Sequence, residues 1–174
     1  MALDTARDLL LHELSDTMSA EHIVLDMLES LAAETGHAEV KAAVKHHQTE
    51  TRQQIRNLEK VFTLLKAKPE KTTCHAAEGL KEEHDSLLSE KPSPLVLEVG
   101  NLAGAAKTEH YEIASYTLLI QMARNLGESD VVDLLKENLD QEKEMARTVE
   151  SLARTVGKEV RQGLKELAAA EAGK

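Results

Sequence analysis

Aromatic residues are nearly absent from this chain of 174 residues, which has no tryptophan, two tyrosines and one phenylalanine. Sandwiches and barrels of β-strands draw heavily on aromatic and β-branched residues, so this scarcity disfavours an all-β fold. Leu, Ala, Glu and Lys, which favour helices, are abundant instead. The composition therefore predicts an all-α protein, and the length predicts one domain with a sizeable core.

Three further shortages limit the location and the partners of the protein. A single cysteine, Cys74, cannot form an internal disulfide, which fits a reducing cytoplasm. No apolar run reaches about 18 residues, and the N-terminus has no basic flank, so we expect neither a membrane span nor a secretory signal. Positive charge is also scarce, since the net charge is −10. This balance argues against nucleic acid and anionic membranes as partners.

Helix breakers divide the sequence into five helical segments. Gly36 and Gly127 each end a long helix, and Pro94 suits the first position of the fourth segment. The predicted helices cover about residues 4–34, 38–67, 75–89, 94–125 and 129–156. Four long helices thus form two hairpins, joined by a long crossover that carries a short extra helix, as in a four-helix bundle. We expect the bundle to span residues 1–157, with residues 158–174 as a tail that can form one more short helix.

Each long helix carries an apolar stripe with alternating steps of four and three residues, as bundle packing requires. In the fourth helix the expected stripe begins at Leu95 and Val99. Glutamate interrupts all four stripes, a second glutamate follows one turn later in the fourth helix, and the second helix adds a histidine. These residues are Glu21, His47, Glu50, Glu109, Glu112 and Glu142.

The interruptions are level with one another along the bundle. Glu21 lies 15 residues before the first turn glycine, Gly36, and Glu50 lies 14 residues after it. In the second hairpin, Glu112 and Glu142 each lie 15 residues from the turn glycine. At about 1.5 Å per residue, the members of each hairpin therefore reach the same height. The crossover can return the second hairpin to whichever end brings the two pairs together.

Five carboxylates in a bundle core need neutralising charge, because an unpaired buried charge costs several kcal/mol. Lys and Arg are absent from the adjacent stripe positions. Two divalent or trivalent cations would bring the net charge of such a site close to zero. Carboxylate-rich ligation with one imidazole suits iron or manganese. The pattern therefore predicts a dinuclear site with two iron ions, or manganese as the alternative. The competing interpretation is four stripes that drift toward solvent.

Several stretches resemble the ferritin-like superfamily and, within it, the YciF-like bacterial stress proteins. The most specific is "EHYEIASY" (109–116), and the others are "LSDTMSAEH" (14–22), "HHQTETRQQ" (46–54), "CHAAEGLKEE" (74–83) and "LLKENLDQEK" (134–143). The resemblance implies a ferritin-like bundle, a di-iron type of site on the six residues above, a homodimer and a link to stress. It implies no agreed reaction.

The sequence also departs from the ferritin and rubrerythrin pattern, in which a histidine follows a bridging glutamate by three residues. Gln53 and Met145 occupy those positions after Glu50 and Glu142. The second metal would then have no histidine ligand and would take Glu112, which puts strong oxidase chemistry in doubt because ligands tune redox potential.

Other polar residues allow two interpretations each. His110 is expected beside the metal ligands or at the surface rather than as a ligand, and Tyr111 is expected at an interface or at the surface. No catalytic residue is assigned. Tyr116 is either core filler with its hydroxyl satisfied or a redox-active or hydrogen-bonding neighbour of the metals. The set of His75, Glu78 and Glu82, beside Cys74, is either a second metal site or a solvated acidic face.

Two functions remain open at this point. The first is a di-iron oxidoreductase in which oxygen or peroxide oxidises Fe(II). The second is a non-catalytic stress protein in which the metal is structural or stored. The sequence lacks a Cys-x-x-Cys electron donor, so turnover as a reductase would need an external donor.

Overall fold

The computed structural model describes residues 3–172, and these residues form five α-helices with no strand among them. The helices are α1 (Ala6–Glu34), α2 (Ala38–Leu64), α3 (His75–Ser89), α4 (Pro94–Asn125) and α5 (Ser129–Ala172). The predicted all-α fold of two long hairpins with a short helix in the crossover is confirmed.

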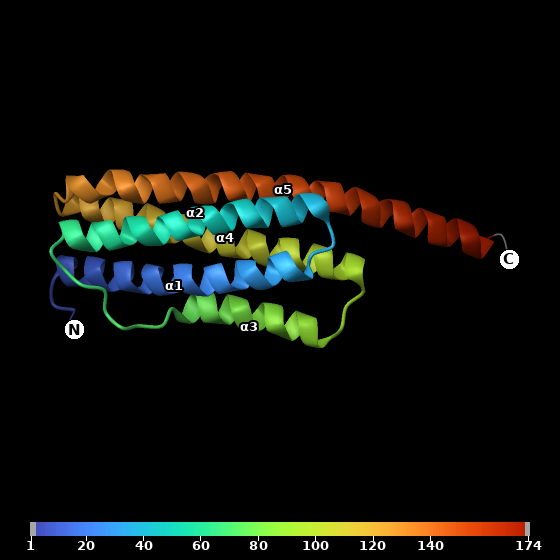
Figure 1. Cartoon of the computed structure of the whole chain (residues 1–174), viewed down its shortest axis with the longest axis horizontal. Coiled ribbons are helices and arrows are strands. Elements are labelled where there is room, and N and C mark those ends of the chain that lie inside the picture. The colour runs from blue at the N-terminus through green and yellow to red at the C-terminus, as the bar shows by residue number, and fades with distance from the viewer. Residues whose placement is uncertain (1–2, 173–174) are drawn as a thin grey trace.

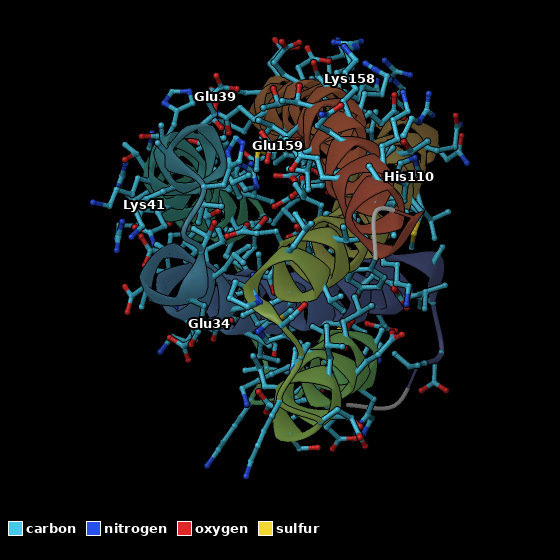
Figure 2. The ribbon with its side chains drawn as sticks, turned by 90° about the vertical axis from the view of Figure 1, so that its right-hand side faces the viewer. Glu34, Glu39, Lys41, His110, Lys158 and Glu159 are labelled. Carbon is cyan, nitrogen blue, oxygen red and sulfur yellow. The ribbon has the colours of Figure 1, made fainter. Side chains whose placement is uncertain are left out.

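The four long helices form a bundle in which each contacts two neighbours: α1 packs on α2 and α4, and α5 packs on the same two helices. The short helix α3 lies outside this bundle, against α1 and α4, as the end-on view in Figure 2 shows. The turn between α1 and α2 and the turn between α4 and α5 lie at opposite ends of the bundle (Figure 1). The middles of the four long helices therefore come together.

The helix ends follow from local sequence. Thr5 and Asp8 form a reciprocal capping box at the start of α1, which satisfies two backbone N–H groups that have no helical partner. Pro94 occupies the first turn of α4, where its missing N–H is not needed. Gly127 has φ of 75°, a left-handed conformation that glycine adopts without strain and that ends α4.

The core consists of two apolar clusters separated by a polar layer. The first cluster fills the end near the α4–α5 turn and includes Leu10, Leu58, Leu119 and Leu135. The second fills the other end, with residues of the same four helices that include Val24, Val44, Leu102 and Val149. Between the two clusters, α1, α4 and α5 carry buried glutamates, and α2 carries the buried His47. The interior of the bundle is thus apolar, polar and apolar along its length.

The predicted stripe is wrong at the start of α4. Leu95 and Val99 are exposed, whereas Glu98 is buried. The carboxylate of Glu98 accepts hydrogen bonds from the Thr35 hydroxyl (2.7 and 2.9 Å) and from the backbone N–H groups of Gly36 (2.6 Å) and His37 (3.1 Å). These hydrogen bonds require Glu98 to face the α1–α2 turn, so the first residues of α4 are rotated relative to the predicted stripe. Helix periodicity alone cannot predict this rotation.

The last helix also differs from its expected bounds. We expected it to end near residue 156 and a separate short helix to follow, but α5 continues unbroken to Ala172. Its last part projects beyond the other helices (Figure 1). Near the start of this projection, Nε2 of His37 lies 3.4 Å from Oε1 of Glu159, which Figure 2 labels. Residues 173–174 of the expected tail lie outside the described residues.

The short helix α3 is fixed to the bundle at both ends. At its start, Cys74 is the N-cap, and its backbone N–H donates to the Ser19 hydroxyl of α1 (3.0 Å). Near its end, Leu87 packs against Gly100 of α4, where a Cβ would collide with the leucine side chain. Close packing thus explains Gly100, while Gly104 has open space where a Cβ would lie.

Candidate metal centre

Four of the predicted ligands meet in the polar layer. His47 of α2, Glu109 and Glu112 of α4 and Glu142 of α5 each offer one ligand atom, and these atoms all lie within 4.8 Å of one another. The four side chains are buried. The matched heights predicted from the turn glycines are therefore consistent with the structure, and the crossover does bring the two hairpins together at this level.

Atoms without partners face one another in this group. Nε2 of His47, Oε2 of Glu109, both oxygens of Glu112 and Oε2 of Glu142 are buried and have no hydrogen-bond partner. Nε2 of His47 lies 3.6 Å from Oε2 of Glu109 and 3.6 Å from Oε2 of Glu142. Buried polar atoms are nearly always hydrogen-bonded, so several unsatisfied acceptors around one point indicate a place for a cation. The residues present thus fit a metal ion.

Glu50 lies behind the histidine and is not one of the four. Its Oε2 is 3.0 Å from Nδ1 of His47, and its side chain is partly exposed. The hydrogen bond with His47 lowers the pKa of Glu50, so this carboxyl is ionised and can only accept. Nδ1 therefore carries the ring proton, and the lone pair of Nε2 is left for a metal. Carboxylates commonly hold metal-binding histidines in this way.

Glu21 enters the layer from α1 beside the group of four. It is completely buried, and its Oε1 accepts a hydrogen bond from the hydroxyl of Tyr116, while its Oε2 has no partner. Tyr116 in turn accepts a hydrogen bond from Nδ2 of Asn138 (2.9 Å). The tyrosine thus fills the core with its hydroxyl satisfied, and one of its hydrogen bonds is to a predicted ligand.

Three amide side chains beside the group form a hydrogen-bond network that the sequence pattern did not predict. Nε2 of Gln54 donates to Oε1 of Glu142, and Nδ2 of Asn57 donates to Oδ1 of Asn138 (2.9 Å). Nδ2 of Asn138 also donates to the backbone oxygen of Gln54 (3.3 Å). Gln54 lies four residues before the core residue Leu58, so helix spacing places both on one face of α2. Asn57 and Asn138 each lie one residue before a leucine of the apolar stripe, so the sequence pattern did not predict that they are buried.

Burial and mutual repulsion dominate the electrostatics of the centre. Burial raises the pKa of Glu21, Glu109 and Glu112 well above the ordinary value of 4.5, and the charge of Glu142 raises each pKa further. Burial also raises the pKa of Tyr116, and the charge of Glu21 adds to this effect. Within residues 3–172, no Lys or Arg forms an ion pair with these glutamates, and the basic side chain beside them is the imidazole of His47. The centre therefore favours protons or metal cations.

The remaining candidates lie away from the centre. His110 is exposed on α4 (Figure 2), and its Nδ1 is 2.8 Å from the backbone oxygen of Ala106. His75 and Glu82 are exposed, and Glu78 is half-buried. Within residues 3–172, these three do not form a group with ligand spacing, which agrees with a solvated acidic face.

Tyr111 was expected at an interface or at the surface, and it lies where α3 meets α1 and α4. The residue is half-buried, and its hydroxyl lies 2.9 Å from Sγ of Cys74 and donates to Oδ2 of Asp16 (3.3 Å). Burial raises the pKa of both the Cys74 thiol and the Tyr111 hydroxyl. The contact therefore ties α3 to α1 and α4, and it does not create a reactive thiolate.

The family model described as "Domain of unknown function (DUF892)" matches residues 5–164 of this chain. Protein YciF of Escherichia coli (strain K12) is 37% identical over 144 residues, which cover 82% of this chain and 87% of that protein. The chain belongs to this YciF-like family. The resemblance inferred from the sequence is thereby confirmed.

Solved structures of the family have the same fold. The crystal structure of the E. coli stress protein YciF matches with a TM-score of 0.86 and 35% identity, over 89% of this chain and 98% of that chain. YcfI from Rhodopseudomonas palustris, whose description proposes a structural role, matches with a TM-score of 0.83 and 35% identity, over 85% and 94%.

A protein from Xanthomonas campestris pv. campestris is a more distant structural match. It has a TM-score of 0.73 at 22% identity, over 92% of this chain and 99% of that one, and it shows the shared fold alone. Among the described residues of the present chain, none of the helices is long and apolar enough to span a bilayer.

Proposed function

We propose that the polar layer of this YciF-like protein binds two iron ions, or two manganese ions, through Glu21, His47, Glu109, Glu112 and Glu142, with Glu50 orienting His47. The observation that carries the proposal is the buried group of four ligand atoms within 4.8 Å of one another. Five oxygen or nitrogen atoms of this group lack a hydrogen-bond partner. Oxygen-rich ligation with one imidazole supports iron or manganese over zinc bound by thiolates.

The ligands have different surroundings, which supports different roles. Glu112 has two unpartnered oxygens, and both would be available to a bound cation. Glu50 holds the His47 ring through Nδ1 from a partly exposed position and would orient this ligand. Iron bound here would supply a redox couple and a place for an oxidant. Tyr116 and Glu21 can pass a proton between the phenolic oxygen and the carboxylate that accepts its hydrogen bond.

The function that this arrangement supports best is a stress-associated ferritin-like protein that oxidises Fe(II) with oxygen or peroxide. The link to stress comes from the likeness to E. coli YciF, which its structural description calls a stress protein. Iron and its oxidant are themselves the simplest substrates. In the cytoplasm, where we place the protein, such a reaction would remove reactive iron together with peroxide.

A second candidate is a non-catalytic protein in which the metal stabilises a homodimer or is stored. The likeness to YcfI favours it, because the description of that protein proposes a structural role. The exposed side chains of Leu95, Val96 and Val99 at the start of α4 are a candidate surface for contact with a second copy. Sedimentation at several protein concentrations would test the dimer, and oxidant consumption would separate the two functions.

The decisive experiment is elemental analysis of protein produced in media rich in iron and in manganese. We expect about two ions per chain in the parent and less than one in Glu112→Gln. Glu98→Gln is the matched control, since Glu98 is a buried glutamate on the same helix whose oxygens already have partners. Full metal content in Glu112→Gln, or equal loss in Glu98→Gln, would contradict the proposed centre.

Stopped-flow absorbance then tests the reaction itself. Anaerobic protein loaded with Fe(II) is mixed with oxygen or with hydrogen peroxide, and the rate is compared with that of free Fe(II). We expect faster oxidation by the loaded protein. A rate equal to that of free iron, with full metal content, would favour the structural function.

A further inference from the structure

A largely apolar cavity of about 220 Å³ lies between α1, α3 and α4, next to the proposed centre. Its walls include Leu28 of α1, Leu80 and Leu87 of α3, and Gly104 of α4. Glu109, one of the four grouped ligands, also lines it. Lys107 and Glu83 form an ion pair between α4 and α3 and line the same space, where both side chains are more than half exposed. The cavity therefore extends from the protein surface to the flank of the centre.

One amide side chain in the cavity wall has no hydrogen-bond partner. Asn101 lines the cavity and is 2% exposed, and neither Oδ1 nor Nδ2 of its amide forms a hydrogen bond. A buried amide without partners destabilises the fold, because it has lost its hydrogen bonds to water and gained none. Such a group on the wall of an apolar cavity is typical of a ligand site, where a few polar atoms orient the bound molecule.

The amide and the charges define the ligand. Asn101 offers one donor and one acceptor, so its complement has a donor and an acceptor side by side. An ionised carboxylate is a poor complement, since it can only accept and would lie close to Glu109. A neutral carboxamide, or a hydroxyl group, satisfies both atoms of Asn101. The apolar walls favour a hydrocarbon or aromatic body.

The cavity volume sets the size of the body. An engineered apolar cavity of about 150 Å³ holds one benzene molecule. In proportion, the present cavity of about 220 Å³ accommodates roughly nine non-hydrogen atoms. Benzamide has this size and carries the required group, so it is a suitable probe.

We propose that this cavity binds a small, neutral, mostly apolar molecule through the amide of Asn101 and holds it beside Glu109. The assignment of this molecule as a substrate or effector of the metal centre rests on the proposed function. Binding itself does not, because every wall of the cavity is made by this chain.

Benzamide binding to the full chain, measured by calorimetry in the presence of a chelator, tests the proposal without any metal. Toluene replaces the amide with a methyl group, and benzoate replaces it with a charge. We expect benzamide to bind at least tenfold more tightly than either. With Asn101→Leu, the affinity for benzamide should fall about tenfold and the preference over toluene should disappear.

A cavity-filling variant provides the second test. Gly104→Leu places a side chain in open space and should weaken the binding of both benzamide and toluene at least tenfold. Gly157→Leu is the matched control, because Gly157 is a helical glycine of α5 with equally open surroundings. Circular dichroism confirms that each variant folds.

The proposal is overturned if benzamide does not bind, if toluene binds as well as benzamide, or if Gly157→Leu weakens binding as much as Gly104→Leu. Metal content is measured separately on the same proteins. If the metal content contradicts the proposed centre but benzamide still binds, the cavity assignment stands. If metal is bound as proposed but benzamide does not bind, only the cavity assignment is contradicted.

Discussion

The hydroxyl of Tyr116 on α4 donates a hydrogen bond to Oε1 of Glu21 on α1. Both residues are completely buried, and the same hydroxyl accepts a hydrogen bond from Nδ2 of Asn138 on α5. Three of the four long helices thus meet at one phenolic oxygen. Hydrogen bonds of this kind hold a carboxylate in place whether or not a metal is bound.

Tyr116→Phe should destabilise the metal-free protein by about 1–3 kcal/mol, because it leaves Oε1 of Glu21 without its donor and Asn138 without one acceptor. Urea denaturation with chelator measures this loss. In Fe(II)-loaded protein the same variant should also change the fate of oxidising equivalents after mixing with oxygen, as stopped-flow absorbance reports.

Tyr111→Phe is the control, since Tyr111 is the other tyrosine of the chain and contacts Cys74 and Asp16 instead of the centre. It should leave the oxidation kinetics unchanged. Identical kinetics for the parent, Tyr116→Phe and Tyr111→Phe would show that Tyr116 acts only in stability.

Glu112→Leu should stabilise the metal-free protein by about 2 kcal/mol, which raises Tm by roughly 4–8 °C for a chain of this size. The reason is that both oxygens of Glu112 are buried without partners, so the substitution removes an uncompensated group and leaves no donor unpaired. The same variant should lose the metal-induced rise in Tm that mass action gives the parent. Thermal melts with chelator and with anaerobic Fe(II) measure both effects.

Glu142→Leu should stabilise the metal-free protein less than Glu112→Leu does. Nε2 of Gln54 donates to Glu142, and the substitution would leave this buried amide without its acceptor. A gain for Glu142→Leu that equals or exceeds that of Glu112→Leu would contradict the hydrogen-bond network. An unchanged Tm for both variants would indicate that the carboxylates are solvated.

The metal-free protein should become less stable as pH rises above about 5. The pKa values of Glu21, Glu109 and Glu112 are raised in the fold, so these groups keep protons that the unfolded chain has released. Unfolding then releases protons, and the free energy of unfolding falls by up to about 1.4 kcal/mol per pH unit for each such group. Urea denaturation between pH 5 and about 8 with chelator gives the slope.

Metal should reverse this dependence, because cations compete with protons for the same oxygens and bind more tightly as pH rises. Glu112→Leu should show a shallower slope than the parent in chelator, since one raised pKa has been removed. A metal-free protein whose stability is flat or rises from pH 5 to about 8 would contradict the raised pKa values.

Glu98→Ala should destabilise the fold by about 2–4 kcal/mol without changing metal content. The substitution removes the acceptor of the Thr35 hydroxyl and of the N–H groups of Gly36 and His37 in the α1–α2 turn. Urea denaturation and elemental analysis measure the two quantities. An exposed glutamate such as Glu144 is the control, and its substitution by Ala should stay within about 0.5 kcal/mol. Loss of metal in folded Glu98→Ala would link this turn to the centre.

The helices and the ligand group were accessible from the sequence because both depend on regular spacing. The turn glycines and the positions of Glu21, Glu112 and Glu142 relative to them are enough to place carboxylates at one height. The histidine, three residues before Glu50, follows from the same helical geometry, although the sequence could not tell that Glu50 lies behind the ring and not in the group of four.

Features that depend on contacts between distant residues were not accessible. Glu98 is buried because a turn more than 60 residues earlier requires its oxygens, and Asn138 is buried because it binds Tyr116 and Gln54. The cavity beside Glu109 arises from the way α3 packs on α1 and α4, since Leu87 fits against Gly100. Periodicity within one helix contains no information on any of these contacts.

The polar layer between the two apolar clusters has a consequence for how the bundle unfolds. Each cluster draws residues from the same four helices and is bounded on one side by buried carboxylates. Without a cation, buried carboxylates that raise one another's pKa separate the two ends, so we expect each end to open as a separate cooperative unit. A bound cation would join α2, α4 and α5 at the boundary and make the two units one. Amide hydrogen exchange would then differ between the ends in chelator and become uniform on metal loading.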